Sequence, residues 1–288
     1  MFLQRIALNL FIIVFIVSFY SCEMMNPEEE IPSYIHIDQF TLNTQSDQGS
    51  NSSKITDAWV YVDDQIVGAY ELPATIPILS EGNHEVMIKA GIKVNGISET
   101  RAIYPFYKPY KISLNLIPDS IITINPTITY YSETVFQWKE AFEDGGVTIE
   151  NTIFSDTLIE KTSDPLYVFE GNYSGIVHLD ANHTVYEGKS ITSYDLPSGS
   201  NPVFLELNYK TENEVYIGLF ANTSTESDDV GILHLNKTDT WKKIYINLLN
   251  AINNSTNATD FQVFFRIDKS SDVSNPVILF DNIKLVHF

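Results

Sequence analysis

Apolar and polar residues alternate in short runs along most of the chain, a pattern typical of half-buried β-strands. Two such runs flank the tight pair Asp63-Asp64, as the strands of a hairpin would. Helical periodicity is nearly absent, so the pattern predicts an all-β protein. Further strands are expected at Thr75 to Leu79, His84 to Ala90, Arg101 to Tyr107 and Lys111 to Leu116.

The first group of strands predicts a small β-sandwich over residues 34–120, because short strands and turns follow one another at close spacing. Within it, the run from Ala58 to Gly68, followed by Pro73 and by Leu79 to Val86, resembles the PEGA-like and carboxypeptidase-regulatory-like modules of surface proteins. In those families the unit is a spacer or a binding scaffold. The resemblance implies one of these two roles here.

A second β-rich block covers residues 133–288, after a boundary near residues 118–132 that is marked by Pro118 and Pro126. Four short pieces of this block occur in the order found in jelly-roll carbohydrate-binding modules and their galactose-binding-like relatives. The resemblance implies a C-terminal jelly-roll sandwich that binds glycan or a partner protein. The pieces are Phe142 to Gly146, Gly171 to Leu179, Trp241 to Leu248 and Val277 to Leu285.

The only long apolar run, Ile6 to Tyr20, follows the positive charge of Arg5 and ends just before Cys22, the single cysteine. This is the layout of a secretory signal peptide, here residues 1–21. The stretch from Phe19 to Cys22 resembles a bacterial lipobox, which implies cleavage before Cys22 and acylation of its new N-terminal residue. An uncleaved membrane helix and an ordinary signal peptide with an unrelated cysteine are the alternatives.

The next segment, residues 22–33, is acidic, contains a proline and has little to bury, so it is expected to be a solvated tether. Its Glu28-Glu29-Glu30 resembles the acidic export signal of surface lipoproteins in the Bacteroidetes. The resemblance implies a lipid-anchored protein of the outer membrane that faces the cell exterior. A periplasmic orientation is the alternative.

The formal net charge of −20 restricts the kinds of binding partner that are expected. A surface this acidic repels nucleic acid and anionic lipid headgroups, so neither is expected to bind. Membrane contact is therefore expected through the N-terminal lipid. The remaining partners are a glycan or another envelope protein.

One metal site is implied by the jelly-roll resemblance. In that family, an acidic residue near the opening Phe-Glu segment and the aspartate of the last strand often hold a structural calcium. Glu143 and Asp281 match these positions, and Asp144 could add a third oxygen ligand. The alternative is a solvated turn and a solvated kink with no ion. Calcium is the only cofactor expected.

Two groups of aromatic residues are candidates for binding. Sugar rings stack on exposed aromatic faces and need polar groups for their hydroxyls. A second group is interleaved with prolines, which suits an extended edge or loop, and is predicted to line an interaction surface. A hydrophobic patch that joins the two domains is the alternative for the second group. The candidates for stacking are Trp138, Tyr173, Tyr186 and Tyr216, and those for the surface are Tyr104, Phe106, Tyr107 and Tyr110.

No catalytic motif appears in the sequence. There is neither a Gly-x-Ser-x-Gly nucleophile elbow nor a His-Glu-x-x-His zinc motif, and the six histidines are scattered. Paired carboxylates for glycoside hydrolysis cannot be identified from sequence among 37 acidic residues. The leading hypothesis is a non-catalytic envelope lipoprotein. A structural accessory subunit without sugar binding and a polysaccharide-active enzyme are the alternatives.

Two short motifs are candidates for modification. Asp119-Ser120-Ile121 and Asp156-Thr157-Leu158 resemble the Asp-Ser/Thr-apolar sites at which Bacteroidetes attach O-glycans to exported proteins. The resemblance implies O-glycosylation of Ser120 and Thr157.

Overall fold

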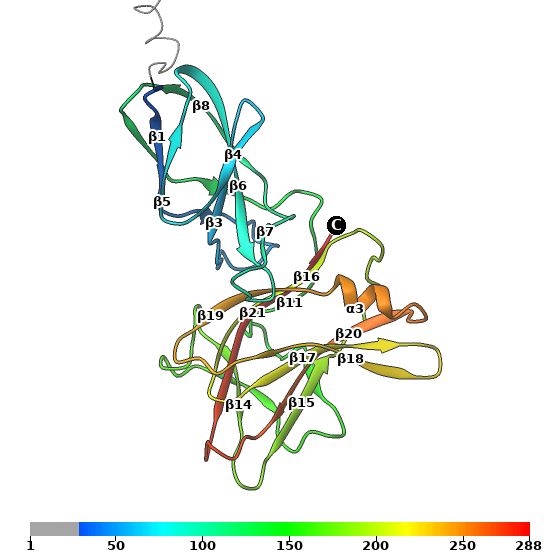
Figure 1. Ribbon diagram of the computed structural model, residues 1–288. Coiled ribbons are helices and arrows are strands. Elements are labelled where there is room, and N and C mark those ends of the chain that lie inside the picture. The colour runs from blue at the N-terminus through cyan, green and yellow to red at the C-terminus, as the bar shows by residue number, and fades with distance from the viewer. Residues whose placement is uncertain (1–28) are drawn as a thin grey trace, which may run out of the picture.

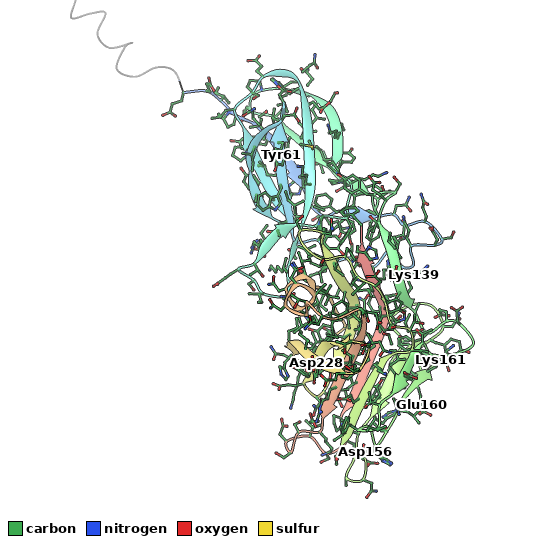
Figure 2. The ribbon with its side chains drawn as sticks, turned by 90° about the vertical axis from the view of Figure 1, so that its right-hand side faces the viewer. Tyr61, Lys139, Asp156, Glu160, Lys161 and Asp228 are labelled. Atoms are coloured by element: carbon green, nitrogen blue, oxygen red, sulfur yellow. The ribbon has the colours of Figure 1, made fainter. Side chains whose placement is uncertain are left out.

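The computed structural model describes residues 29–288, and these form two β-rich lobes stacked end to end (Figures 1 and 2). Within this range the only helix is α3 (Leu249–Asn254). The predicted all-β fold is therefore confirmed. The predicted signal peptide, the lipidation site Cys22 and most of the tether lie outside the described residues. None of the helices within the described range has the length and apolar character that crossing a membrane requires.

The N-terminal lobe is a small sandwich with two main sheets. One sheet has the order β5-β1-β9, and the other has the order β4-β3-β6-β7, with β8 also paired to β6. A short parallel pair, β2 with β10, extends the lobe. The strands are β1 (Ser33–Ile37), β2 (Thr41–Leu42), β3 (Asp57–Val62), β4 (Gln65–Glu71), β5 (Ala74–Ile78), β6 (Gly82–Lys93), β7 (Arg101–Ile103), β8 (Tyr110–Leu116), β9 (Ile121–Ile124) and β10 (Thr127–Ile128).

Local chemistry explains these strands. The hairpin β3–β4 turns at Asp63 and Asp64, whose φ angles of 47° and 63° are the left-handed values of a two-residue hairpin turn. In β1, alternate residues such as Ile35 and Ile37 are completely buried in the core of the lobe. The segment predicted as the boundary, residues 118–132, supplies β9 and β10 and so pairs with the first strands of the chain.

The C-terminal lobe is a jelly-roll sandwich of two sheets, as predicted. One sheet has the order β13-β14-β21-β16-β19, with β11 also paired to β21, and the other has the order β12-β15-β20-β17-β18. Its strands are β11 (Val135–Glu140), β12 (Ile149–Asn151), β13 (Ile159–Thr162), β14 (Ser174–His178), β15 (Val185–Ser190), β16 (Val203–Thr211), β17 (Val215–Asn222), β18 (Ser227–Leu235), β19 (Lys242–Asn247), β20 (Asp260–Asp268) and β21 (Val277–His287).

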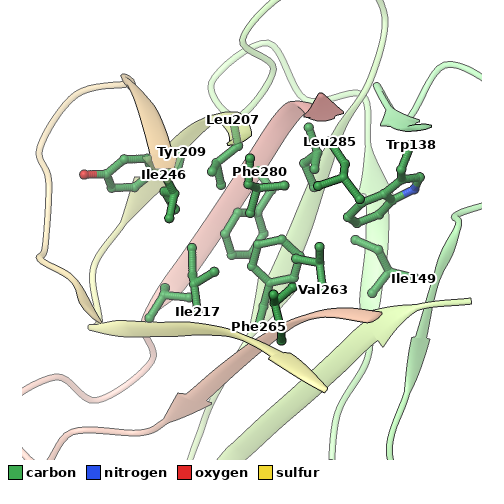
Figure 3. Close-up of a cluster of buried hydrophobic side chains, with 14 of the residues drawn as sticks. Trp138, Ile149, Leu207, Tyr209, Ile217, Ile246, Val263, Phe265, Phe280 and Leu285 are labelled. Carbon is green, nitrogen blue, oxygen red and sulfur yellow. The ribbon is translucent and has the colours of Figure 1, made fainter. Parts of the chain in front are cut away.

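The two sheets of this lobe face each other across a continuous apolar core (Figure 3). Leu207 and Phe280 project from the six-stranded sheet toward Ile217 and Phe265 of the five-stranded sheet. Because side chains alternate between faces along a strand, the neighbours of these residues must point out of the sandwich. Packing in the core therefore determines which residues lie on the outer face of the five-stranded sheet.

The two lobes are joined by buried aromatic residues. Tyr104, Phe106 and Tyr107 are at most 4 % exposed and belong to a core that also contains Phe204 and Tyr245 of the C-terminal lobe. The ring of Tyr104 lies 4.8 Å from that of Tyr245, measured between centroids. The prediction that these three residues line an interaction surface is therefore wrong, because they face the other lobe. The alternative, a patch that joins the domains, is what the structure shows.

A buried charge cluster accompanies this patch. The carboxylate of Glu206, which is completely buried, accepts hydrogen bonds from the hydroxyls of Tyr104 (2.7 Å) and Tyr130 (2.9 Å). Lys243 Nζ lies 3.2 Å from the same carboxylate. Burial alone would raise the pKa of Glu206, but the charges of Lys243 and Lys284 and the two hydroxyls hold it below its ordinary value. The lobes thus meet around a buried, ionised carboxylate.

Candidate ligand-binding face

The outer face of the five-stranded sheet carries aromatic side chains where polar ones would be expected. On β17, Ile217 and Leu219 point into the core, so Tyr216 and Phe220 point outward. On β20, Val263 and Phe265 point inward, and Phe264 points outward. We call Tyr216, Phe220 and Phe264 the aromatic platform.

The ring of Phe264 contacts both other rings of the aromatic platform. Phe220 stacks on Phe264 with 4.6 Å between centroids, and Tyr216 meets Phe264 edge-on at 5.7 Å. His234 of β18 stacks on Tyr216 at 4.6 Å and extends the surface by one more ring. Phe264 is completely buried, while Tyr216 and Phe220 are partly exposed. A ligand would therefore meet two exposed rings supported by a buried one.

Two glycines let these rings lie along the sheet. A Cβ on Gly231 would fall 1.4 Å from the hydroxyl oxygen of Tyr216, and a Cβ on Gly218 would fall 2.5 Å from the ring of Phe264. Each ring therefore lies across the backbone of a neighbouring strand. Glycine at these positions is required by the close approach of ring and backbone.

Charged and amide groups border the aromatic platform on β15 and β20. Arg266 Nη1 lies 3.4 Å from the carboxylate of Glu187, and Lys189 Nζ donates to Gln262 Oε1 at 3.1 Å. Opposite Phe220 on β18 lies Asp229, whose pKa is raised by partial burial and by the charge of Glu187. Donors and acceptors thus stand beside partly exposed rings, which is the combination that sugar hydroxyls and pyranose faces require.

Of the four residues predicted to stack on sugar, Tyr216 alone lies on the aromatic platform. Trp138 is 4 % exposed, donates its indole N–H to Thr148 Oγ1 at 2.9 Å and packs in the core. Tyr186 is completely buried in the same core. The prediction is wrong for both, because their strand positions face the opposite sheet.

Tyr173 is 37 % exposed but lies elsewhere. It immediately precedes β14 of the six-stranded sheet, and Lys161 Nζ sits 4.2 Å from its ring centroid. Lys161 itself is on β13 (Figure 2). The structure therefore does not bring Tyr173 together with Tyr216.

The platform residues Phe220 and Phe264 were missed by the sequence analysis. The sequence does contain a signal for them. In β17 and β20, large apolar side chains occur at both sets of alternate positions, although one set must face outward. Large apolar residues at the outward-facing positions of a strand are the pattern that identifies an apolar outer face of a sheet. Tyr110, predicted for the interaction surface, is partly exposed on β8 of the other lobe.

The predicted calcium ligands lie partly together. Glu143 and Asp281 line one pocket, and Glu170 adds a third carboxylate there, while Asp144 is exposed and is not part of its lining. Glu143 already accepts hydrogen bonds from the backbone N–H groups of Asn172 (2.8 Å) and Tyr173 (2.9 Å). These bonds lower its pKa against the effect of burial.

Asp281 is the unusual carboxyl of this pocket. It is 1 % exposed and accepts hydrogen bonds from Ser174 Oγ at 2.6 Å and from the Asn282 N–H at 2.7 Å. Burial, with a further contribution from the charge of Glu170, raises its pKa to about 7. Among residues 29–288 no three acidic, histidine or cysteine side chains converge as a metal-binding group. The calcium site stays a prediction.

The two predicted O-glycosylation residues lie outside the platform. Ser120 is partly buried just before β9, where its hydroxyl donates to the Ile117 carbonyl at 2.6 Å. Thr157 is partly buried in the loop before β13. Their modification stays a prediction.

No protein-family model matches the sequence, and no curated protein matches it. Solved structures with a similar course of the chain include the CBM22-2 xylan-binding domain from Paenibacillus barcinonensis Xyn10C, at 16 % identity, 53 % and 99 % coverage of this chain and of that one, and a TM-score of 0.38. Another belongs to the carbohydrate-binding modules of the β-sandwich superfamily, at 13 % identity, 90 % and 99 % coverage, and a TM-score of 0.40.

A third structure is the enzymatically active domain of bacteriophage CBA120 tailspike protein 4, at 10 % identity and a TM-score of 0.38. The match covers 49 % of this chain but only 19 % of the tailspike chain. At these TM-scores the likeness supports no conclusion about function. The case for a ligand rests on the geometry of the aromatic platform.

Proposed function

We propose that the C-terminal lobe is a non-catalytic glycan-binding module and that its binding site is the aromatic platform. The observation that carries the proposal is the pair of partly exposed rings, Tyr216 and Phe220, on the outer face of a sheet whose inner face is already fully packed. Aromatic side chains in this position add nothing to the sandwich core. They are explained by a ligand that is flat and apolar on one face.

The dimensions favour a chain of sugars over a single one. Tyr216 and Phe220 are four residues apart on β17, and the ring of Phe264 lies between theirs, with centroids 5.7 Å from Tyr216 and 4.6 Å from Phe220. Arg266 and Asp229 lie on the strands that flank β17, and Glu187 lies on β15 beside Arg266, so these groups can meet hydroxyls along the length of such a chain. An extended oligosaccharide satisfies both the rings and the polar border.

The cellular setting is part of the proposal. The apolar run before Cys22 and the acidic residues after it support a lipid-anchored envelope protein that faces the cell exterior. Protease treatment of intact cells tests the orientation, with a Cys22→Ala variant as control. Degradation of the wild type while an internal marker survives is the expected result, and protection until lysis would contradict it.

A panel of soluble polysaccharides in native affinity gels tests glycan binding. We expect at least one polysaccharide to retard the wild type and to retard Tyr216→Ala and Phe220→Ala much less. Tyr173→Ala is the matched control, because it removes an exposed ring that lies off the platform. Equal retardation of all four proteins would place binding elsewhere. No retardation by any polysaccharide would favour the accessory-subunit alternative.

A further inference from the structure

A second pocket lies between the two lobes and has an unusual lining. Its volume is about 300 Å³, and it is formed by the turn after β6, the loop that follows β18, and β19. Lys93 comes from the N-terminal lobe, and Lys242 and Lys243 come from the C-terminal lobe. Lys54, on the segment before β3, completes a group of four lysines.

The charge of this pocket opposes that of the chain. Four of the 17 lysines and arginines line it, and no acidic residue of the described range 29–288 does. The chain as a whole has a formal net charge of −20, so a pocket without a single carboxylate stands out against its surroundings. Like charges gathered in a concave site repel one another unless an anion offsets them.

Only two of the four lysines are paired with a carboxylate in the described part of the chain. Lys93 pairs with Glu71 at 3.2 Å, and Lys243 pairs with Glu206 at 3.2 Å. Within residues 29–288 no carboxylate lies within ion-pair distance of Lys54 or Lys242, since neither takes part in any of the ion pairs found there.

Lys243 is the buried member of this group of four lysines. Its side chain is 3 % exposed, and Nζ makes no well-aligned hydrogen bond in the described part of the chain, despite its short distance to Glu206. Because Nζ is buried beside the carboxylate of Glu206, an anion in the pocket does not touch it, and the exposed ammonium groups of Lys54 and Lys242 are the donors that can reach the anion.

The pocket adjoins the aromatic platform through one residue. His234 belongs to the pocket lining, and its ring stacks on Tyr216 at 4.6 Å. A saccharide lying on Tyr216 that continues past β18 therefore arrives at the lysines. One ligand can use both surfaces.

We infer that this pocket between the lobes is an oxyanion-binding site that takes the carboxylate or sulfate group of an acidic saccharide. The identification of the ligand as a saccharide rests on the proposed function, whereas the anion site does not. Lysine ammonium groups suit either oxyanion, because they act as point charges without a fixed fork geometry. The contact is charge-dependent and weakens as salt screens it.

Thermal melting of the purified protein tests the site, with sodium sulfate, galacturonic acid and galactose as probes at one ionic strength. We expect sulfate, galacturonic acid or both to raise the melting temperature by a few degrees, because an anion that binds only the folded state stabilises it. Galactose, which lacks the charge, should leave it unchanged. A shift with sulfate alone shows that the site prefers a sulfate group, and a shift with galacturonic acid alone shows that it prefers the carboxylate of a uronate.

The variants make the test specific. Lys54 and Lys242 are exposed, so a double change to glutamine should keep the fold and reduce the affinity for the anion at least tenfold. Lys111→Gln removes an exposed lysine of the N-terminal lobe that does not line the pocket, so this variant should keep the full shift in melting temperature. No shift with either anion, or the same shift in the double variant, would overturn the anion site.

The platform variant separates this site from the proposed function. Phe220→Ala should lose polysaccharide binding and keep the sulfate or galacturonic acid shift. A wild type that binds either anion but no polysaccharide would leave the anion site standing and reject the glycan-binding proposal. A wild type that binds polysaccharide but neither anion would support the glycan-binding proposal and overturn the anion site.

Discussion

Asp281 is a buried carboxyl whose protonation affects the stability of the fold. Its carboxyl holds a proton up to about pH 7 in the folded state, whereas the ordinary pKa is 3.8. Because the folded pKa is raised, this stabilisation is present at acid pH and is lost as the pH rises from about 4 to 7. Between pH 5 and 8 the loss is on the order of 2–3 kcal/mol, at 1.4 kcal/mol for each pH unit.

We therefore expect Asp281→Asn to gain stability relative to the wild type as the pH rises from 5 to 8. The neutral amide cannot ionise, so it escapes the cost of a buried charge. Urea unfolding of both proteins at the two pH values measures the difference. A gap that stays constant, or that moves in favour of the wild type, would show that Asp281 is ionised in the folded protein throughout.

Calcium gives a second prediction at the same residue. If Asp281 and Glu143 hold a calcium ion, the ion stabilises the ionised form of Asp281 and should raise the melting temperature more at pH 8 than at pH 5. Asp281→Asn should abolish that gain, and Asp144→Asn, whose side chain is exposed outside the pocket, should keep it. A melting temperature unaffected by calcium or by a chelator would remove the site.

At the scale of elements, β18 supports the platform through Gly231. Changing Gly231 to alanine places a Cβ where the Tyr216 hydroxyl now lies, so the ring must turn away from the sheet. We expect at least a tenfold loss of glycan affinity and a loss of stability of about 1–3 kcal/mol. Gly145→Ala is the matched control, because no atom lies within 4 Å of its added Cβ. An unchanged glycan affinity of Gly231→Ala would mean that the position of the Tyr216 ring against β18 does not matter for glycan binding.

The alternation of residues was enough to predict the hairpin at Asp63 and several further strands, including β5, β6 and β8, whereas β16, β17 and β18 were not predicted. It was not enough to predict which aromatics are exposed. Trp138 and Tyr186 lie on strands just as Tyr216 does, and which face of a strand meets the core depends on its partners in the opposite sheet. That information is carried by tertiary packing, so the platform became visible only with the sandwich assembled.

At the scale of the whole molecule, the joint between the lobes could not be predicted either, because its partners are about 100 residues apart. Tyr104 of one lobe meets Glu206 of the other, and only the folded chain shows that the proline-rich aromatic segment is interior. Since Glu206, Lys243 and the tyrosines are shared, we expect the two lobes to unfold in one transition.

Glu206→Gln tests this joint. The change leaves Lys243 and Lys284 buried without their counter-charge and should destabilise the protein by about 3–5 kcal/mol. Glu85→Gln, which removes one partner of an exposed ion pair, should cost less than about 1 kcal/mol. Urea unfolding followed by tryptophan fluorescence and circular dichroism measures both. Two separate transitions in the wild type, or a loss similar to that of the control, would contradict the shared cluster.

Glycan binding by the aromatic platform is measured by calorimetric titration with the polysaccharide that retards the wild type most. We predict measurable binding to the wild type and to Tyr173→Ala, and binding to Tyr216→Ala that is weaker by about fivefold to thirtyfold, since each stacked ring contributes about 1–2 kcal/mol. Equal affinity of the wild type and Tyr216→Ala, with both folded, would contradict the claim.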